Sequence, residues 1–437
     1  MGIKVAKFGG SSVADAIQVK KIRDIIEADK DIHYVIVSAP GKRFDKDSKI
    51  TDLLYSCQTH IEHNLPYEQL FQVVCDRFNA MEMNLGVKIN LKKELDTILE
   101  ALQEGTTEDY IASRGEYLNA RLIAAFLGFD FVDAARMVQF DAKGRFLEEE
   151  TDRALAAELK KHERAVIPGF YGARPDGSIK TFSRGGSDIT GAIVARAVHA
   201  DVYENWTDVS GFLMADPRIV PNPEPISRIS YKELRELSYM GASVLHEDAI
   251  YPARVAGIPI NIRNTNQPQD PGTIITAEPE ESEHVIKGIA GSRDFTVFAI
   301  YKNSMSTEIG FIRRLAGIFE DFHISIEHIP SGIDTVSVVV KGEEVRDCID
   351  EIVEECKVQL HPDSVEVFED IAVIATVGSG MSRKTGTSAR LLTALARQQI
   401  NIRMIDQGSS EMNIIVGVRN DDFETAIRAI YDAFVKL

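Results

Sequence analysis

The last third of the chain contains an internal repeat, which limits the folds that this region can adopt. Residues 310–340 align without a gap to residues 386–416, with Leu315 falling on Leu391. Each copy is predicted to form a strand, a glycine turn, a helix, two further strands and a second helix, the order of a ferredoxin-like βαββαβ unit. Such units add strands and faces but no cluster of catalytic side chains. The repeat therefore predicts a sensing or association module.

A polar, acidic run separates this repeat from the rest of the chain. Residues 277–283 read Ala-Glu-Pro-Glu-Glu-Ser-Glu, a composition typical of a linker. Because 437 residues exceed what one hydrophobic core usually serves, two or three domains are expected. We predict a first domain at 1–276, a linker at 277–287, and two further domains at 288–367 and 368–437.

The chain opens on a strand, a glycine pair and two hydroxyls, followed by a predicted helix at 13–27. Glycine lets the backbone approach a ligand closely, and the first-turn amides of a helix favour an anion. Lys7, at the end of the strand, would hold a mobile phosphate as a point charge. The alternative is an ordinary turn at Gly9 and Gly10, so a phosphate site here needs support from elsewhere in the chain.

A second Gly-Gly turn leads into a helix at residues 184–191. A helix cap there requires only Ser187 or Asp188, and it does not require Arg184 with two glycines as well. Arg184 presents a planar fork that can bind a substrate carboxylate through two hydrogen bonds. This stretch is the second candidate for an anion site.

Further candidate residues follow predicted strands or begin predicted helices. The apolar run 34–39 predicts a strand buried on both faces of a parallel sheet, which places Ser38 at its carboxyl end. Thr207 and Asp208 end another strand, and Thr51 enters a helix. Glu116 is predicted in the first turn of a helix at 117–127, where it would either complement the helix dipole or receive a substrate ammonium.

Composition excludes several classes of function. The formal net charge of −18 argues against nucleic acid or an anionic membrane as the main partner. Four cysteines without CxxC spacing predict free thiols in a reducing compartment. With no signal peptide and no apolar run long enough to span a bilayer, a cytoplasmic location is expected.

Two features resemble functional motifs but are set aside, and no metal-ligand set is predicted. Residues 378–385 resemble a P-loop, but Arg383 stands where that motif requires glycine. His246 lacks a metal-spaced partner, which favours a structural role.

Together these candidates favour phosphoryl transfer. That reaction requires cradled phosphates, neutralised charge and an acceptor oxygen held in line. Two glycine-rich anion sites and a Thr-Asp loop meet the first needs. Glu116 and Arg184 would hold an acceptor that carries both amino and carboxyl groups.

At this point the chain resembles the aspartate kinases over essentially its whole length. The resemblance rests on Lys7 to Ser12, Arg184 to Asp188, Trp206 to Val209 and Asp216 to Arg218, in that order. It implies a three-layer αβα amino acid kinase domain with a mainly parallel sheet, followed by two ACT domains. It also implies transfer of the γ-phosphate of ATP, with Mg²⁺, to the side chain of L-aspartate.

The resemblance assigns roles by matched position. Lys7 would neutralise the transferring phosphate, and Asp188 is the second catalytic candidate, with phosphate, metal and acceptor left open as its partners. The residues implied for aspartate are Ser38, Thr51, Glu116, Arg184 and Ser187. Those implied for the nucleotide are Lys7, Gly9, Gly10, Ser11, Thr207, Asp208, Phe212, Arg218 and Ser243. Two of these depart from many relatives, which carry tyrosine in place of Phe212 and lysine in place of Ser243.

For the repeat, the resemblance implies an amino-acid effector bound between ACT domains of two subunits. We expect lysine rather than threonine, because Glu327 would receive an effector ammonium, and we expect a homodimer through these domains or a dimer of dimers. The positions implied for the effector are Gly310, Phe311, Ile312, Glu327 and Ser331.

Two alternatives remain open from the sequence. The first is another kinase of the same fold, acting on glutamate, acetylglutamate, carbamate or a nucleotide. The second is a catalytically inactive amino-acid sensor, which the substitutions at Phe212 and Ser243 would suit. Because the repeat is followed by no further domain, a monofunctional protein is expected.

Overall fold

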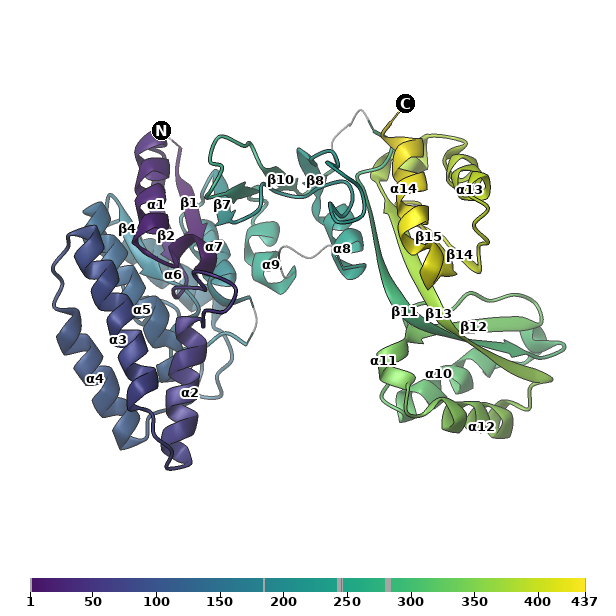
Figure 1. Ribbon diagram of the computed structural model, residues 1–437, viewed down its shortest axis with the longest axis horizontal. Helices are drawn as coiled ribbons and strands as arrows, with labels where there is room; N and C mark the ends of the chain where they lie inside the picture. The colour runs from purple at the N-terminus through teal and green to yellow at the C-terminus, as the bar shows by residue number, and fades with distance from the viewer. Residues whose placement is uncertain (1, 184, 242–244, 246, 280–283, 437) are drawn as a thin grey trace. The chain divides into compact units, whose positions relative to one another are not determined.

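The chain forms two compact units. The computed structural model describes residues 2–183, 185–241, 245, 247–279 and 284–436 (Figure 1). The first unit comprises Met1–Phe212, Ser227–Tyr231 and Val244–Glu278, and the second comprises Leu213–Ile226, Lys232–Ser243 and Pro279–Leu437. Two short segments within the predicted first domain thus belong to the second unit.

A mainly parallel sheet forms the centre of the first unit. Within the described residues it has eight strands in the order β3-β4-β2-β1-β7-β9-β10-β8. Only the β9–β10 pair is antiparallel. The strands are β1 (Lys4–Phe8), β2 (Ile32–Val37), β3 (Asp130–Phe131), β4 (Ala165–Pro168), β7 (Val202–Thr207), β8 (Arg228–Ser230), β9 (Ile260–Asn264) and β10 (Thr273–Thr276). The predicted parallel α/β fold is confirmed.

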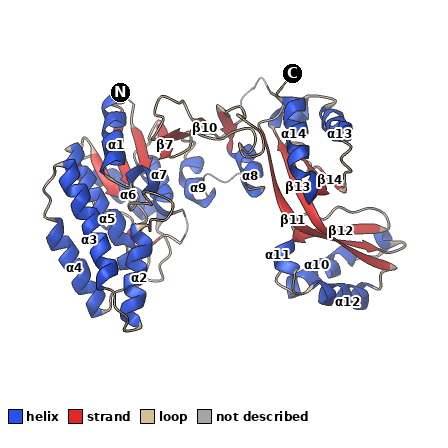
Figure 2. Cartoon of the chain, viewed as in Figure 1, coloured by secondary structure: helices blue, strands red, loops and turns tan. Residues whose placement is uncertain are grey.

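Helices cover both faces of this sheet (Figure 2). Helix α5 packs on β2, β3 and β4, together with a block formed by α2, α3 and α4, whereas α7 packs on β1, β2 and β7 with α6 and α9 beside it. A small hairpin of β5 (Tyr171–Ala173) and β6 (Ile179–Thr181) lies outside the sheet. The helices of this unit are α1 (Ala16–Ala28), α2 (Ile50–Glu62), α3 (Glu68–Leu85), α4 (Leu91–Glu104), α5 (Glu108–Leu127), α6 (Glu148–Leu159), α7 (Gly186–Ala197) and α9 (Glu247–Val255), whereas α8 (Tyr231–Tyr239) belongs to the second unit from its second residue on.

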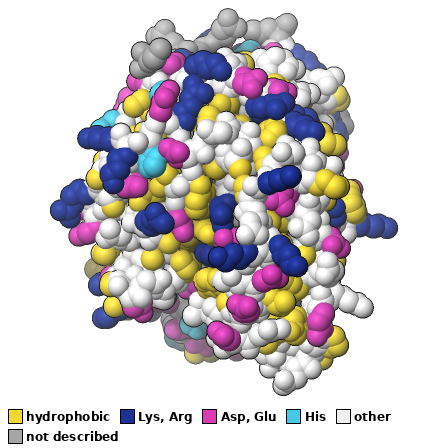
Figure 3. Space-filling model, turned by 90° about the vertical axis from the view of Figure 1, so that its left-hand side faces the viewer, with side chains coloured by type: hydrophobic (Ala, Val, Ile, Leu, Met, Phe, Trp, Pro, Cys, Tyr) yellow, Lys and Arg dark blue, Asp and Glu magenta, His cyan; other side chains and the backbone are white. Residues whose placement is uncertain are grey.

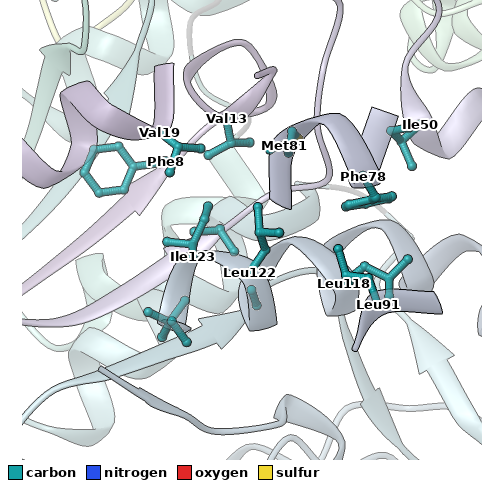
Figure 4. Packing of buried hydrophobic residues seen from close by; sticks show 14 of the residues in the cluster. Phe8, Val13, Val19, Ile50, Phe78, Met81, Leu91, Leu118, Leu122 and Ile123 are labelled. Carbon is teal, nitrogen blue, oxygen red and sulfur yellow. The ribbon is translucent and has the colours of Figure 1, made fainter. Parts of the chain in front are cut away.

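The alternation of side chains along β1 separates the core from the site. Ala6 and Phe8 join the hydrophobic cluster shared with α1 to α5. Figure 4 shows Phe8 among the packed side chains of this cluster, together with Val19 and Ile123. Because successive side chains of a strand point to opposite faces, Lys7 points away from this cluster, toward α7.

Two predicted helix boundaries are wrong. Helix α5 begins at Glu108 with Thr107 as its cap, so Glu116 lies in the middle of the helix and does not complement the dipole of a first turn. A short 3₁₀ turn, Gly10–Val13, follows the glycine pair, and α1 starts only after Asp15, whose carboxylate accepts from the amides of Ile17 and Gln18. His246 lies outside the described residues.

The second unit contains one antiparallel sheet built from both repeats. Its five strands within the described residues have the order β12-β11-β13-β15-β14. They are β11 (Gly288–Tyr301), β12 (Thr335–Lys341), β13 (Ser364–Val377), β14 (Met404–Asp406) and β15 (Asn413–Arg419). The helices are α10 (Phe311–Asp321), α11 (Gly342–Val345), α12 (Ile349–Leu360), α13 (Thr387–Arg397) and α14 (Phe423–Phe434).

Strands β11 and β13 are long because each serves both halves of this sheet. Residues 288–292 pair with 373–377, whereas residues 295–301 pair with 364–371. The predicted boundary after residue 367 therefore falls inside β13. The half around α10 and α12 has its own core, in which Phe298, Leu315 and Val338 are fully buried.

The stretch that resembles a P-loop in sequence does not have the structure of one. Residues 379–383 form a short 3₁₀ turn, and the amide of Ser379 donates to a carboxylate oxygen of Glu233 at 2.9 Å. This arrangement is not a phosphate-binding loop.

In the described part of the chain, none of the helices is long and apolar enough to cross a membrane. On the face shown in Figure 3, acidic and basic side chains are interspersed.

Candidate active site

The candidate site lies where β1 meets β2 and β7. These three strands are parallel, so their carboxyl ends lie at one edge of the sheet. The amide of Gly9 donates to Trp206 O at 2.9 Å, and the amide of Ser38 donates to Phe8 O at 3.2 Å. On one side of β1 the sheet continues with β2, and on the other side with β7, so the strand order runs in opposite directions from β1. Such a topological switch point is the usual ligand position in an open α/β sheet.

Lys7 and Asp188 form an ion pair at this edge. Lys7 Nζ lies 2.6 Å from Asp188 Oδ1, with the lysine side chain 8% exposed and the aspartate 24%. Asn205, which pairs with Lys7 in the β1–β7 register, donates from Nδ2 to the same oxygen at 2.7 Å. Two donors therefore fix one carboxylate oxygen and leave the other to a ligand. Sequence reasoning missed Asn205, although its place two residues before Thr207 was a usable signal.

Three glycines bring the backbone close together around this pair. A Cβ on Gly9 would lie 3.4 Å from Lys7 Nζ, so glycine leaves room for the ammonium. A Cβ on Gly41 would lie 2.6 Å from the carbonyl carbon of Gly10, a distance that no side chain tolerates. The amide of Gly41 donates to Gly10 O at 2.9 Å. The glycine pair and the loop after β2 thus form one continuous wall of the candidate site.

Ser38 and Ser187 meet across the site. Their hydroxyls form a short hydrogen bond that joins the carboxyl end of β2 to the first turn of α7. The approach is possible because a Cβ on Gly169, which follows β4, would lie only 2.2 Å from Ser187 Cβ. The Ser187 residue is 6% exposed. Ser38 and Ser187, both predicted to bind the aspartate substrate, are therefore brought together. Asp188 directly follows Ser187 in the chain.

Glu116 is a buried carboxyl group that forms no ion pair within the described residues, although the charge of Arg114 acts on it. It is 6% exposed, and its Oε2 atom has no hydrogen-bond partner there. Burial raises the pKa of Glu116 to about 8, against the opposing effect of the Ala39 amide that donates to it. Gly115 permits this position, since a Cβ there would lie 2.7 Å from Ala39 Cβ. One turn further on α5, Asn119 Nδ2 donates to Ser38 O at 2.7 Å, a contact that the sequence did not suggest.

A pocket of about 620 Å³ opens at this edge and is lined by six of the predicted residues, although Lys7, Ser187 and Asp188 are not among them. The predicted residues among its lining are Gly10, Ser11, Ser38, Thr51, Glu116 and Asp208. Much of the remaining wall comes from the loop between β2 and α2, including Lys42, Arg43 and Lys49. These cations were not predicted, because nothing in a polar loop marks which lysines face a pocket.

Other predicted nucleotide residues have different surroundings. Phe212 is 4% exposed, and its amide donates to Thr273 Oγ1 at 2.8 Å. Arg218 belongs to the second unit, where it pairs with Asp216 at 2.6 Å. Thr207 Oγ1 donates to Asp208 Oδ1 at 3.2 Å. Arg184 and Ser243 lie outside the described residues.

A resident metal centre finds no support in the described residues, where no group of three or more histidine, cysteine, aspartate or glutamate side chains could hold an ion. Mg²⁺ commonly binds through substrate phosphates and one or two carboxylates, keeping several waters. Asp188 and Asp208 are two acidic residues at this edge. Their chemistry fits an ion that arrives with a nucleotide.

The predicted effector residues lie at the start of α10 and in the segment between α10 and β12. Gly310 has φ +79° and precedes α10, whose first residue, Phe311, is 2% exposed. Ile312 is 42% exposed, and Ser331 forms an isolated bridge with Val336. The Glu327 side chain is 7% exposed and lies 3.9 Å from the ammonium of Lys341.

Comparisons with known proteins agree with this architecture. A model described as "Amino acid kinase family" matches residues 2–264, and one described as "ACT domain" matches residues 374–434. Aspartokinase 3 of Bacillus subtilis (strain 168) is 38% identical over 99% of this chain and 98% of its own length.

Two solved structures are also similar. Aspartate kinase of Clostridium acetobutylicum has a TM-score of 0.93 at 49% identity, covering 99% of this chain and 100% of its own. Aspartokinase III of E. coli, in complex with aspartate and ADP, has a TM-score of 0.72 at 25% identity and covers 99% of both chains. A family model over more than half of the residues and a relative this similar over nearly the full length show that the chain belongs to the amino acid kinase family, and within it to the aspartokinases.

Proposed function

We propose that this chain transfers the γ-phosphate of ATP to the side-chain carboxylate of L-aspartate, giving 4-phospho-L-aspartate and ADP. The observation that carries the proposal is the edge at β1, where the Lys7–Asp188 ion pair lies at the carboxyl end of the strand and a pocket is lined by Gly10, Ser11 and the buried Glu116. Membership of the aspartokinases supports the same reaction. Such a product would be the activated acid of an amino-acid biosynthetic route to lysine, threonine and methionine.

Charge neutralisation is the main task of the chain in this reaction. Lys7 would stabilise the transferring phosphoryl group, while Gly9 and Gly10 let backbone amides approach it. Asp188, held by Lys7 and Asn205, would use its second oxygen toward the phosphates or the Mg²⁺ that accompanies them. Mg²⁺ supplies charge neutralisation of the phosphates when bound.

The aspartate acceptor would lie beside α5. Glu116 would receive its ammonium, Ser38 and Thr51 would donate to a carboxylate, and Ser187 would support Ser38. We keep Arg184 as the fork for the other carboxylate on the ground of its sequence alone. Because a carboxylate is already nucleophilic at neutral pH, no general base is required.

The nucleotide assignments remain proposals. Ser11, Thr207 and Asp208 would contact the phosphates or ribose from the carboxyl ends of β1 and β7. For Phe212, Arg218 and Ser243, the resemblance in sequence is the support. The buried ring of Phe212 would act as a wall of the nucleotide site rather than a stacking surface.

We further propose regulation by lysine through the second unit, in a cytoplasmic homo-oligomer paired through its ACT domains. Glu327 supports lysine over threonine, since its carboxylate already lies near an alkylammonium group, that of Lys341. Gly310, Phe311, Ile312 and Ser331 would complete the effector site. We retain 288–367 and 368–437 as the two ACT domains, joined to the kinase domain by 277–287.

The direct test is aspartate-dependent ADP release, with hydroxylamine trapping the acyl phosphate as a hydroxamate. We expect hydroxamate from aspartate but not from glutamate, and suppression by lysine. Turnover that no amino acid alters would remove the lysine proposal and keep the kinase. Folded protein that binds lysine but turns over no substrate would instead support the inactive sensor.

A further inference from the structure

Arg77 is a buried cation in the helical block, a region to which the sequence gave no chemical role. It lies on α3, and the residue is only 5% exposed. Burial lowers the pKa of Arg77, because a desolvated guanidinium is costly unless partners compensate it. Its two Nη atoms have such partners, whereas Nε has no hydrogen-bond partner in the described residues.

The partners of Arg77 are backbone carbonyls near the candidate site. Nη1 donates to Ser48 O at 2.7 Å, and Nη2 donates to Gly41 O at 2.6 Å and to Ala14 O at 3.2 Å. Gly41 and Ser48 lie near the two ends of the loop between β2 and α2. Ala14 directly follows the 3₁₀ turn of the glycine pair. One guanidinium thus joins both ends of the loop to that turn.

The same loop has an acidic residue that two arginines share. Asp47 Oδ2 lies 2.8 Å from Arg43 Nε and 3.7 Å from Arg77 Nη1. The Arg43 hydrogen bond, helped by the charge of Arg77, holds the pKa of Asp47 well below its usual range. Asp47 therefore stays ionised and connects Arg77 to Arg43, which lines the pocket.

The position of this loop determines the shape of the pocket. Residues 39–45 and Lys49 form much of its lining, and the amide of Gly41 donates to Gly10 O. Arg77 itself does not line this pocket. A small displacement of such a wall can lower the rate about a hundredfold, because reacting groups must be held to within about 1 Å.

We propose that Arg77 is a positioning residue for phosphoryl transfer, holding the 40–49 loop against the phosphate-binding turn. It acts through carbonyl groups and Asp47, without touching a substrate. This inference rests on the proposed kinase function. A merely structural arginine would lower stability when replaced and leave the kinetic constants of the folded enzyme unchanged.

The test compares Arg77→Ala and Arg77→Lys with a matched control, Arg121→Ala. Arg121 pairs with Glu94 and so joins α5 to α4, away from the loop. For each variant, kcat and KM for aspartate and ATP are measured on the full chain, together with the melting temperature. Trypsin cleavage at Lys42, Arg43, Lys46 and Lys49 reports the loop independently of activity.

We expect Arg77→Ala to lower kcat by ten- to a hundredfold, on the order of what loop misplacement costs, and to speed trypsin cleavage of the loop. Arg77→Lys should have a kcat and a cleavage rate between those of the wild type and Arg77→Ala, because an ammonium lacks the planar fork of a guanidinium. Guanidinium should restore part of the activity of Arg77→Ala, whereas sodium chloride at equal ionic strength should not. A cavity of about 400 Å³, lined in part by Arg77, gives it access.

The inference is overturned if Arg77→Ala keeps wild-type kcat and loop cleavage while only its melting temperature falls. Equal kinetic losses in Arg121→Ala would overturn it too. If Arg77→Ala does not fold, Arg77→Lys decides the question by the same two readouts. Absence of aspartate-dependent turnover in the wild type would instead refute the kinase, and the trypsin result would still report whether Arg77 holds the loop.

Discussion

Burial of Glu116 predicts that aspartate binding releases a proton. In the free protein the pKa of Glu116 is raised from 4.5 to about 8, so the carboxyl group is protonated near neutral pH. A substrate ammonium beside the unpartnered Oε2 atom would favour the ionised form. Binding should therefore remove nearly one proton at pH 7. The affinity for aspartate should rise about tenfold per pH unit as pH increases toward 8.

The same pKa difference predicts how stability depends on pH. A shift from 4.5 to about 8 corresponds to roughly 5 kcal/mol of preference for the protonated form. The folded state binds this proton more tightly than the unfolded chain. Its stabilising contribution is therefore fully present below pH 4.5 and is lost as pH rises toward 8. Glu116→Gln removes this decline, so the variant should gain roughly 3 kcal/mol relative to wild type between pH 4.5 and 7.

Calorimetry in buffers of different ionisation enthalpy measures the proton count directly, and urea unfolding at several pH values measures the stability difference. Glu108→Gln is the matched control, because Glu108 lies on the same helix but is exposed. It should retain both the proton release and the pH-dependent affinity, both of which Glu116→Gln loses. Aspartate binding with no proton release, and with an affinity independent of pH from 6 to 8, would refute the assignment of Glu116 to the ammonium.

Three further substitutions test other parts of the site. Asn205→Leu removes one of two donors to Asp188 Oδ1 and should lower kcat about tenfold with little change in KM, since a hydrogen bond to a charged group contributes about 1.5–3 kcal/mol; an unchanged kcat in steady-state assays would contradict this. Gly41→Ala places a Cβ 2.6 Å from the carbonyl carbon of Gly10 and should cost about 1–3 kcal/mol of stability and most of the activity, measured by thermal unfolding and turnover. Glu327→Ala should shift the lysine inhibition curve to at least tenfold higher concentration without altering uninhibited turnover, and an unchanged curve would mean that the effector ammonium lies elsewhere.

The sequence predicted the candidate site best where residues follow apolar strands. Lys7, Ser38 and Thr207 each end or follow a buried run, and the carboxyl ends of parallel strands meet at one edge of the sheet. Local pattern and sheet geometry therefore sufficed to group them. The repeat likewise predicted the strand-rich second unit.

The remaining parts depend on contacts distant in the sequence. A helix was predicted to start at residue 117, yet α5 starts at Glu108, and Gly115 lies inside it, where its missing Cβ allows Ala39 to approach. Arg77 looks like any other arginine of an amphipathic helix, and only the fold reveals its carbonyl partners. The sharing of β11 and β13 between repeats follows from pairing register, which no single strand encodes.

The central claim is that phosphoryl transfer takes place at the carboxyl end of β1, and two lysines on that strand test it directly. Lys7 pairs with Asp188 at this end, whereas Lys4 pairs with Asp29 at the other. The measurement is kcat for hydroxamate formation from aspartate in Lys7→Ala and Lys4→Ala, each checked for folding by circular dichroism. The account predicts a loss of at least about a hundredfold for Lys7→Ala, in the range of one lost charge-stabilising group, and near wild-type turnover for Lys4→Ala. Wild-type turnover in folded Lys7→Ala, or equal losses in both variants, would contradict it.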